Sequence, residues 1–147
     1  SIQNLERQFR RIGHLQHVSL LQGAKAYGAH VHPVTVPLRE VAPRDPHANF
    51  YWLQEDLLRE VSAKAGFAFT IWRPQVLLGS APGAAMNPVA AVGAYAAICK
   101  ETGRPFVFPG SPQQYEACVD ITDGRIIAKH LLWAATKPAA RNEAFNI

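Results

Sequence analysis

Two side chains in this sequence, Lys25 and Tyr51, could together carry out acid–base chemistry. Lys25 follows a short apolar run at 17–21, and Tyr51 opens a helical pattern after a long proline-rich segment. An ammonium group close to a phenol favours the phenolate, so such a pair can deliver a proton to a substrate oxygen or carbon. Alternatively, Tyr51 packs with its aromatic neighbours at the start of a helix, and Lys25 is a solvated loop charge.

Other groups of polar residues make weaker cases for chemistry. His30 and His32 could both contact a metal, but no third ligand is evident, so we expect no metal site. Glu55 and Asp56 are adjacent and cannot face the same way on a helix, which argues against a paired-carboxylate mechanism. The glycine-bounded segment 79–83 lacks the known phosphate-loop patterns and predicts a tight turn.

The composition is that of one globular domain with a single core. The chain has 147 residues, of which 48% are hydrophobic and 18% charged. No charged start followed by an apolar stretch marks a secretion signal, so we expect a cytoplasmic location. The most lipid-like stretch, Ala84–Ile98, is too short to span a bilayer and contains Asn87 and Pro88. It predicts a buried helix, and we expect no membrane partner.

The charge and the cysteines do not indicate a nucleic-acid or redox function. The net charge is +4, but the 15 Lys and Arg residues are scattered singly, and a nucleotide cofactor explains this balance as well as DNA would. Nucleic-acid binding is therefore the last-ranked function, and no nucleic-acid partner is expected. The spacing of Cys99 and Cys118 fits neither a redox pair nor a zinc framework, which predicts reduced packing thiols.

Alternating helical and buried-strand patterns predict an α/β fold, a parallel sheet with helices on both faces. We expect strands at 17–21, 67–72, 106–108 and, less regularly, 115–121, and helices around Leu5–Ile12, from Asn49 to Gly66, at 88–102 and from Thr122 or Asp123 onward. The predicted inward positions are Leu53, Leu57, Val61 and Ala65 in the second helix, with Glu55 in solvent, and Ile126, Ile127, Leu131, Leu132 and Ala135 in the last.

Ligands of such folds bind at the carboxyl ends of the strands. This rule points to the connections 22–48, 73–83 and 109–114. The segment Gly28–Ala48 carries four prolines without a sustained period and predicts an irregular surface loop. Loops of this length in compact domains are usually functional.

Several ordered blocks resemble one family: QGAKAYG at Gln22, NFYWLQEDLL at Asn49, WRPQVLLGS at Trp72, MNPVAAVGAYAAICKETG at Met86, LLWAAT at Leu131 and NEAFNI at Asn142. They are similar to the progesterone 5-beta-reductase and iridoid synthase group of extended short-chain dehydrogenases. The resemblance covers nearly the whole chain. It implies that Lys25 and Tyr51 form the active pair and that Pro74-Gln75-Val76 contact the nicotinamide end of the cofactor.

The resemblance also implies an activity. An NAD(P)H-dependent reductase would transfer hydride to the β-carbon of an enone, or to a carbonyl carbon, of a hydrophobic small molecule. Tyr51 would hydrogen-bond the oxygen where negative charge develops, and Lys25 would also hold the nicotinamide ribose. NADPH is favoured over NADH by family habit. Gln22 stands where relatives often have a hydroxyl residue, so the third polar group of the site is open.

Relative to this family, residues 1–147 resemble a single, incomplete Rossmann-type domain, the C-terminal half of the nucleotide-binding domain. The glycine-rich dinucleotide fingerprint and the C-terminal part are not among them. An incomplete parallel sheet exposes an edge and helix faces, so we expect a homodimer or larger homo-oligomer. The competing hypothesis is a noncatalytic module that binds a small molecule or a protein, with no cofactor bound.

Overall fold

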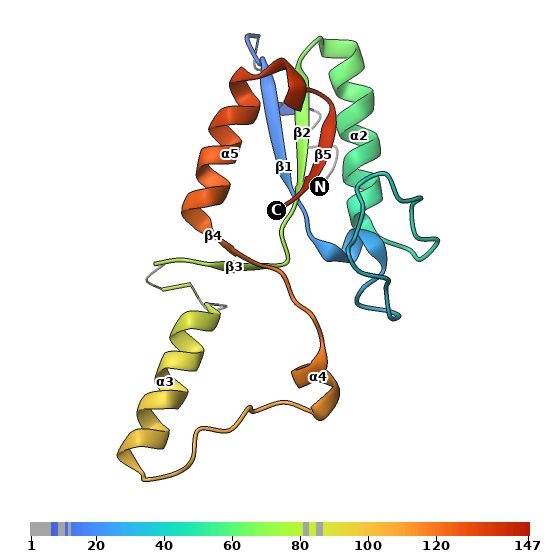
Figure 1. Ribbon diagram of the computed structural model, residues 1–147. Coiled ribbons are helices and arrows are strands. Elements are labelled where there is room, and N and C mark those ends of the chain that lie inside the picture. The colour runs from blue at the N-terminus through green and yellow to red at the C-terminus, as the bar shows by residue number, and fades with distance from the viewer. Residues whose placement is uncertain (1–6, 9–10, 12, 81–82, 85–86) are drawn as a thin grey trace.

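The computed structural model describes residues 7–8, 11, 13–80, 83–84 and 87–147. Its centre is a three-stranded parallel sheet of β1 (His17–Leu21), β2 (Ala68–Arg73) and β5 (Glu143–Asn146), in the order β1-β2-β5 (Figure 1). The register pairs Ser19 with Thr70, and Thr70 with Glu143. The α/β fold with a parallel sheet is therefore confirmed, as are the strands predicted at 17–21 and 67–72.

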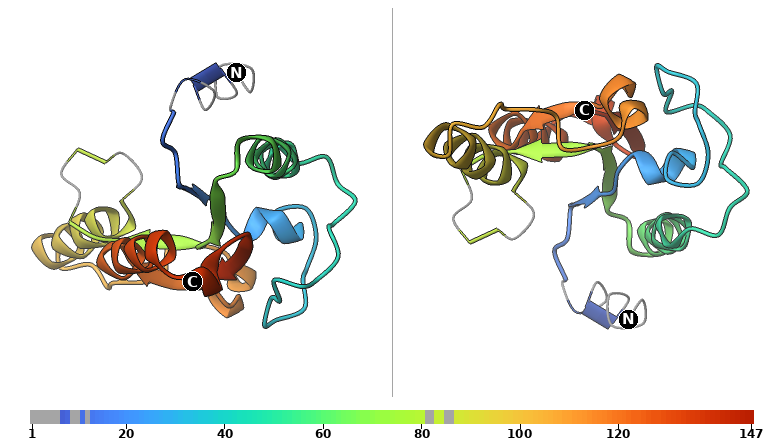
Figure 2. Two further views of the ribbon diagram at one scale, coloured as in Figure 1. Left: turned by 90° about the horizontal axis from the view of Figure 1, so that it is seen from above. Right: turned by 90° about the horizontal axis from the view of Figure 1, so that it is seen from below.

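β2 is the central strand because it pairs with β1 on one edge and β5 on the other, and its side chains are covered on both faces. Phe69 and Ile71 pack under α2 (Phe50–Ala65), whereas Trp72 packs on the opposite side with residues of α5 (Gly124–Thr136) and the segment after it. Figure 2 shows α2 and α5 on opposite sides of the sheet. Alternate strand residues point to opposite faces, so one apolar strand supplies both packing clusters.

α2 starts and ends where the sequence predicted, but its buried face differs. Asn49 caps the first turn, and Gly66 ends the helix with a φ of 78°. The predicted inward residues Leu53 and Ala65 are exposed, and Glu55, predicted in solvent, is only 2% exposed. The prediction was wrong because Arg73, at the end of β2, pairs with Glu55 and draws it into the interior. The buried residues of α2 are Glu55, Leu58, Val61 and Ser62.

The chain after β2 departs most from the prediction. The connection after Arg73 contains a short strand, β3 (Val76–Leu78), which pairs in parallel with β4 (Ile121–Asp123). The strand predicted at 106–108 is irregular, and the one predicted at 115–121 is replaced by α4 (Pro112–Glu116) and β4. A capping box between Ser111 and Gln114 starts α4, so these local hydrogen bonds override the β propensity of the sequence around it.

The last two long helices form at the predicted caps, but their apolar faces are largely uncovered. α3 (Pro88–Glu101) follows its cap Asn87, and α5 follows its cap Asp123. Among the described residues of α3, only Cys99 is buried. The prediction that the apolar stretch ending at Ile98 forms a buried helix was therefore wrong. In α5 the predicted inward positions Ile126, Leu132 and Ala135 are exposed, whereas Ile127 and Ala134 are buried.

Remaining expectations can be placed briefly. The helix predicted around Leu5, Phe9 and Ile12 lies outside the described residues. Cys99 and Cys118 are both free thiols, as predicted, but only Cys99 is buried, so the prediction of a packing role was wrong for the exposed Cys118. None of the helices in the described ranges is long and apolar enough to cross a membrane.

Candidate functional site

A small cavity lies at the carboxyl ends of β1 and β2, as expected for this class of sheet. The amide of Gln22 still pairs with the carbonyl of Trp72 at 2.8 Å, and the segments that follow the two strands form part of the cavity wall. After β1 the chain forms a short 3-10 helix, η1 (Ala24–Tyr27). The cavity has a volume of about 250 Å³, and its wall consists of Gln22, Gly23, Ala24, Lys25, Ala29, His30, Tyr51, Pro74 and Gln75.

This cavity brings together four of the five residues predicted for the site. Lys25 comes from η1, Tyr51 from the first turn of α2, and Pro74 and Gln75 from the connection after β2. Val76 is not part of the wall and begins β3 instead. The roles assigned to these residues stay predictions, but residues far apart in the sequence do line one cavity.

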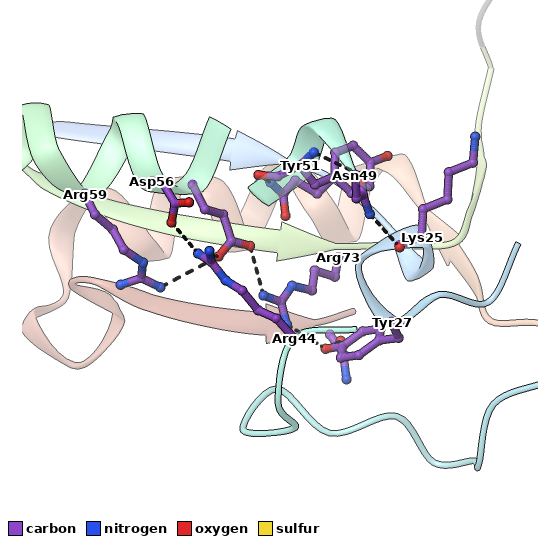
Figure 3. A network of polar contacts seen from close by, with 11 residues as sticks. Lys25, Tyr27, Arg44, Asn49, Tyr51, Asp56, Arg59 and Arg73 are labelled. Atoms are coloured by element: carbon purple, nitrogen blue, oxygen red, sulfur yellow. Dashed lines mark hydrogen bonds and ion pairs between the residues drawn. The ribbon is translucent and has the colours of Figure 1, made fainter. Parts of the chain in front are cut away.

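Asn49 connects the two elements that carry Lys25 and Tyr51. Its side-chain oxygen accepts a hydrogen bond from the amide of Tyr51 at 3.0 Å, and its amide group donates to the carbonyl of Lys25 at 2.7 Å (Figure 3). Gln22 adds a third link, because its Nε2 donates to the carbonyl of Tyr51 at 3.0 Å. The sequence predicted Asn49 only as a helix cap, and the second bond requires a fold that places η1 beside it.

Gly23 is required because the segment after β1 lies directly against the segment after β2. A Cβ at this position would lie 2.8 Å from the carbonyl oxygen of Pro74 and 3.7 Å from the Tyr51 hydroxyl. The first distance is too short for any side chain, and the contacting atom belongs to the backbone. Glycine therefore lets the ends of β1 and β2 close around Tyr51.

The Lys25 side chain is exposed at the rim of this cavity. Within the described part of the chain no carboxylate forms an ion pair with its ammonium group. An ammonium group in this position can donate hydrogen bonds to hydroxyl or phosphate oxygens of a ligand. The arrangement thus offers one cationic donor and one phenolic hydroxyl at the same opening.

A buried polar network lies directly behind the cavity, and the sequence did not predict it. The guanidinium of Arg73 donates to Glu55 Oε1 at 2.9 Å and to the Tyr27 hydroxyl at 2.9 Å. It also lies 5.0 Å from the centre of the Tyr27 ring (Figure 3). Burial alone lowers the pKa of Arg73, but the bonds to Tyr27 and Glu55 outweigh it and raise the pKa. The sequence did contain one signal for this network, because the charged Arg73 directly follows the mostly apolar residues 68–72 of β2.

Arg44 makes a second, more exposed connection between the long loop and α2. Its Nη2 lies 2.7 Å from Asp56 Oδ1 and 3.5 Å from Glu55 Oε2, and its guanidinium covers the ring of Trp52 at 4.8 Å. The bond to Asp56 raises the pKa of Arg44 and lowers that of Asp56. Since Arg44 is largely solvated, we ascribe only a small stabilisation to this pair.

The long loop Gly28–Ala48 is irregular, as predicted, and one carboxylate holds it together. Asp45 accepts hydrogen bonds from His32 Nε2 at 2.6 Å and from His47 Nδ1 at 2.5 Å. Hydrogen bonds from the His47 backbone amide and ring, then from His32, lower the pKa of Asp45 to about 2. The ring of His47 in turn contacts that of His30, at 4.8 Å between centres, so this cluster reaches the wall of the cavity.

These histidines do not assemble a metal centre. In the ranges that the structure describes, no group of three or more His, Cys, Asp or Glu side chains could hold a metal ion. His32 bonds to Asp45 and to the carbonyl of Pro33 instead. The cluster therefore orders the loop through hydrogen bonds.

Comparison with known proteins agrees with this architecture. No family model matches the chain. The chain is 38% identical over 141 residues to an (S)-8-oxocitronellyl enol synthase of Antirrhinum majus and 39% identical over 141 residues to a 3-oxo-Delta(4,5)-steroid 5-beta-reductase of Arabidopsis thaliana. Both alignments cover 90% of this chain and 36% of the relative. The chain thus spans about a third of the length of these curated relatives.

A solved structure shows the same fold. The terminal R domain from the myxalamid PKS-NRPS biosynthetic pathway superimposes with a TM-score of 0.55 at 20% sequence identity. The superposition covers 87% of this chain and 32% of that domain, and at this identity it is evidence for the fold alone. The resemblance predicted from the sequence blocks is confirmed by the curated relatives, and the chain is a homologue of about one third of these enol synthases and steroid 5-beta-reductases.

Proposed function

We propose that this chain provides the reaction site of an NAD(P)H-dependent reductase that acts on an enone or a carbonyl of a hydrophobic small molecule. The names of the relatives, an enol synthase and a steroid 5-beta-reductase, support this reaction class. One observation carries the proposal: Lys25 and Tyr51, from different elements, line the same cavity at the carboxyl ends of β1 and β2.

The residues of the cavity suit the nicotinamide end of such a cofactor. Lys25 offers an ammonium group at the rim, where a ribose hydroxyl or a phosphate could accept its hydrogen bonds. The volume of about 250 Å³ is below the roughly 300–1,000 Å³ of sites that enclose a whole drug-sized ligand. We therefore assign to it the reacting ends of cofactor and substrate only. We propose NADPH as the preferred cofactor.

Four residues of the cavity wall have distinct parts in the proposed reaction. A bound reduced nicotinamide would supply the hydride. Tyr51 donates a hydrogen bond to the substrate oxygen, where negative charge develops as hydride arrives, and then supplies a proton. Lys25 favours the resulting phenolate through its positive charge. Gly23 and Pro74 shape the wall against which the reacting groups are held.

Substitution of Tyr51 by phenylalanine tests this proposal. The substrate would be cyclohexenone, and the measurement the loss of NADPH absorbance. Removing a preorganised donor of this kind costs roughly 100- to 1,000-fold in kcat, so Tyr51→Phe should be nearly inactive. Calorimetry should show that NADPH still binds. Tyr95→Phe is the matched control, because its hydroxyl bonds to Val107 in a different part of the molecule.

The same experiment separates the reductase from the noncatalytic module. Turnover that Tyr51→Phe leaves unchanged would refute the assigned role of Tyr51. Small-molecule binding without turnover, equal in the unmodified protein and in Tyr51→Phe, would instead support a binding module derived from a reductase.

A further inference from the structure

We propose that Tyr27 and Glu55 are positioning residues, which fix the positions of Lys25 and Tyr51 relative to each other through the buried guanidinium of Arg73. This inference rests on the reductase site proposed above. It concerns residues that do not line the cavity themselves and that act through their neighbours in the chain.

The two partners of Arg73 each lie close in the chain to a site residue. Glu55 follows Tyr51 by one turn of α2, so the two side chains share a face of the helix. Tyr27 is the last residue of η1, the element that carries Lys25. Arg73 itself directly precedes Pro74 in the cavity wall. One guanidinium therefore connects three segments of the wall.

The Tyr27 hydroxyl extends this connection to the third strand and the long loop. It accepts from Arg73 and donates to Asn146 Oδ1 at 2.6 Å, at the end of β5. The amide group of Asn146 donates to the carbonyl of Leu38 at 2.9 Å, and its backbone amide donates to Glu40 Oε1 at 2.7 Å. The Tyr27 hydroxyl thus joins η1 to the carboxyl ends of β2 and β5, and Asn146 joins the long loop to the same network.

Positioning explains this network better than stability does. The cost of removing two charges from water is comparable to what a buried ion pair returns, and apolar replacements are often as stable. α2 is in any case anchored to the sheet by Leu58 and Val61, which pack on Phe69 and Ile71. The pair of Glu55 and Arg73 lies nearer the start of the helix, beside Tyr51, where the geometry of the site is set.

Tyr27→Phe is the sharpest test, because it keeps the ring against Arg73 and removes only the hydroxyl. With NADPH and cyclohexenone, kcat should fall roughly 10- to 100-fold, as expected when reacting groups are slightly misplaced. The KM for cyclohexenone should change less than about threefold, since that substrate does not contact Tyr27. A parallel fall in kcat and rise in KM would overturn the proposal.

Amide hydrogen exchange provides a readout that needs no ligand. In Tyr27→Phe the amides of Ala26 and Gly28, which bond to the carbonyls of Gly23 and Lys25, should exchange faster. Amides of β1 and β2 should keep their rates. Unchanged exchange in η1, or faster exchange throughout the sheet, would show that the hydroxyl does not position η1.

Two further variants keep the test decisive. Glu55→Gln preserves an acceptor for Arg73 and should lower kcat in the same direction, even if Tyr27→Phe folds poorly. Tyr95→Phe loses one hydroxyl bond elsewhere and should leave kcat and the exchange of η1 unchanged. If the unmodified protein neither binds NADPH nor turns over, the proposed function fails, whereas the exchange of η1 still decides the positioning role.

Discussion

The sheet around β2 and the segment 87–120 are both rich in apolar residues, but the segment 87–120 leaves nearly all of them uncovered. Ile71 in β2 is fully buried between α2 and its neighbouring strands, whereas Ile98 in α3 is 60% exposed. Figure 1 shows α3 and α4 on the far side of β3 from the sheet. Apolar composition therefore indicates that a surface favours burial, and the tertiary structure decides whether another element covers it.

The candidate site lies at the edge of the well-packed region. Its walls come from the segments after β1 and β2 and from the start of a helix anchored by Leu58 and Val61. Rigid elements place reacting groups more precisely than exposed segments do. The exposed face of α3 is consistent with the predicted homo-oligomer, which stays a prediction.

The largest contrast is expected from truncating the two isoleucines. Ile71→Ala leaves a cavity in the core and should lower the free energy of unfolding by about 2–5 kcal/mol. Ile98→Ala, the matched control, should change it by less than about 0.5 kcal/mol. Urea unfolding followed by circular dichroism measures both. Equal losses would mean that α3 is packed as well as the sheet.

Alanine substitutions at two glycines should change the stability of the protein in opposite directions. Gly23→Ala places a Cβ against the Pro74 carbonyl and should destabilise the fold by about 1–3 kcal/mol and reduce turnover. A Cβ added to Gly93 in α3 would meet no neighbouring element within 4 Å, so Gly93→Ala should stabilise α3 by about 0.5–1 kcal/mol. Thermal unfolding compares them, and a stabilising Gly23→Ala would disprove the close approach.

The two asparagine caps separate local from global effects. Asn49→Ala should cost about 1 kcal/mol of global stability, because it frees α2 and also releases the carbonyl of Lys25. Asn87 caps α3 in the same way, with its oxygen 3.1 Å from the amide of Val89. Asn87→Ala should fray α3 without changing the main unfolding transition. Hydrogen exchange that showed global loss in both variants would contradict this difference.

The smallest effect concerns the pH dependence of the loop Gly28–Ala48. Bonds to the Pro33 carbonyl and to Asp45 raise the pKa of His32 above 6.5, so its contribution is present below pH 6.5 and is lost as pH rises through the shifted pKa. The pKa of Asp45 is lowered to about 2, so its contribution is present above pH 3.8 and is lost as pH falls through about 2. The loop should therefore be most stable between pH 3.8 and pH 6.5, where both contributions are fully present.

An NMR titration of His32 tests this expectation. Asp45→Asn should lower the pKa of His32, because the carboxylate no longer stabilises the imidazolium. Asp56→Asn, which loses an Arg44 contact instead, should leave the titration of His32 unchanged. If Asp45→Asn leaves the pKa of His32 unchanged, the Asp45 carboxylate does not hold His32 in the loop.

Local signals predicted the bounds of the long helices α2, α3 and α5 well, whereas the short helix α4 and the short strands were missed. Asn49 with Gly66, and Asn87 with Pro88, are caps whose hydrogen bonds depend only on near neighbours in the chain. β3, β4 and β5 have only three or four residues each, so their patterns are too short to be distinguished from loops. Their pairing depends on partners that are distant in the sequence.

The sequence by itself determined the α/β class, the strands at 17–21 and 68–73 and the caps of the long helices, because these follow from local patterns. Ordered blocks of resemblance singled out Lys25 and Tyr51, whose roles stay predictions. Only the tertiary structure decided that Glu55 is buried against Arg73, that Asn49 bonds to the Lys25 carbonyl, and that the Pro74 carbonyl lies close to Gly23. Each of these contacts joins residues brought together by the parallel sheet, and no spacing along the chain encodes such a contact on its own.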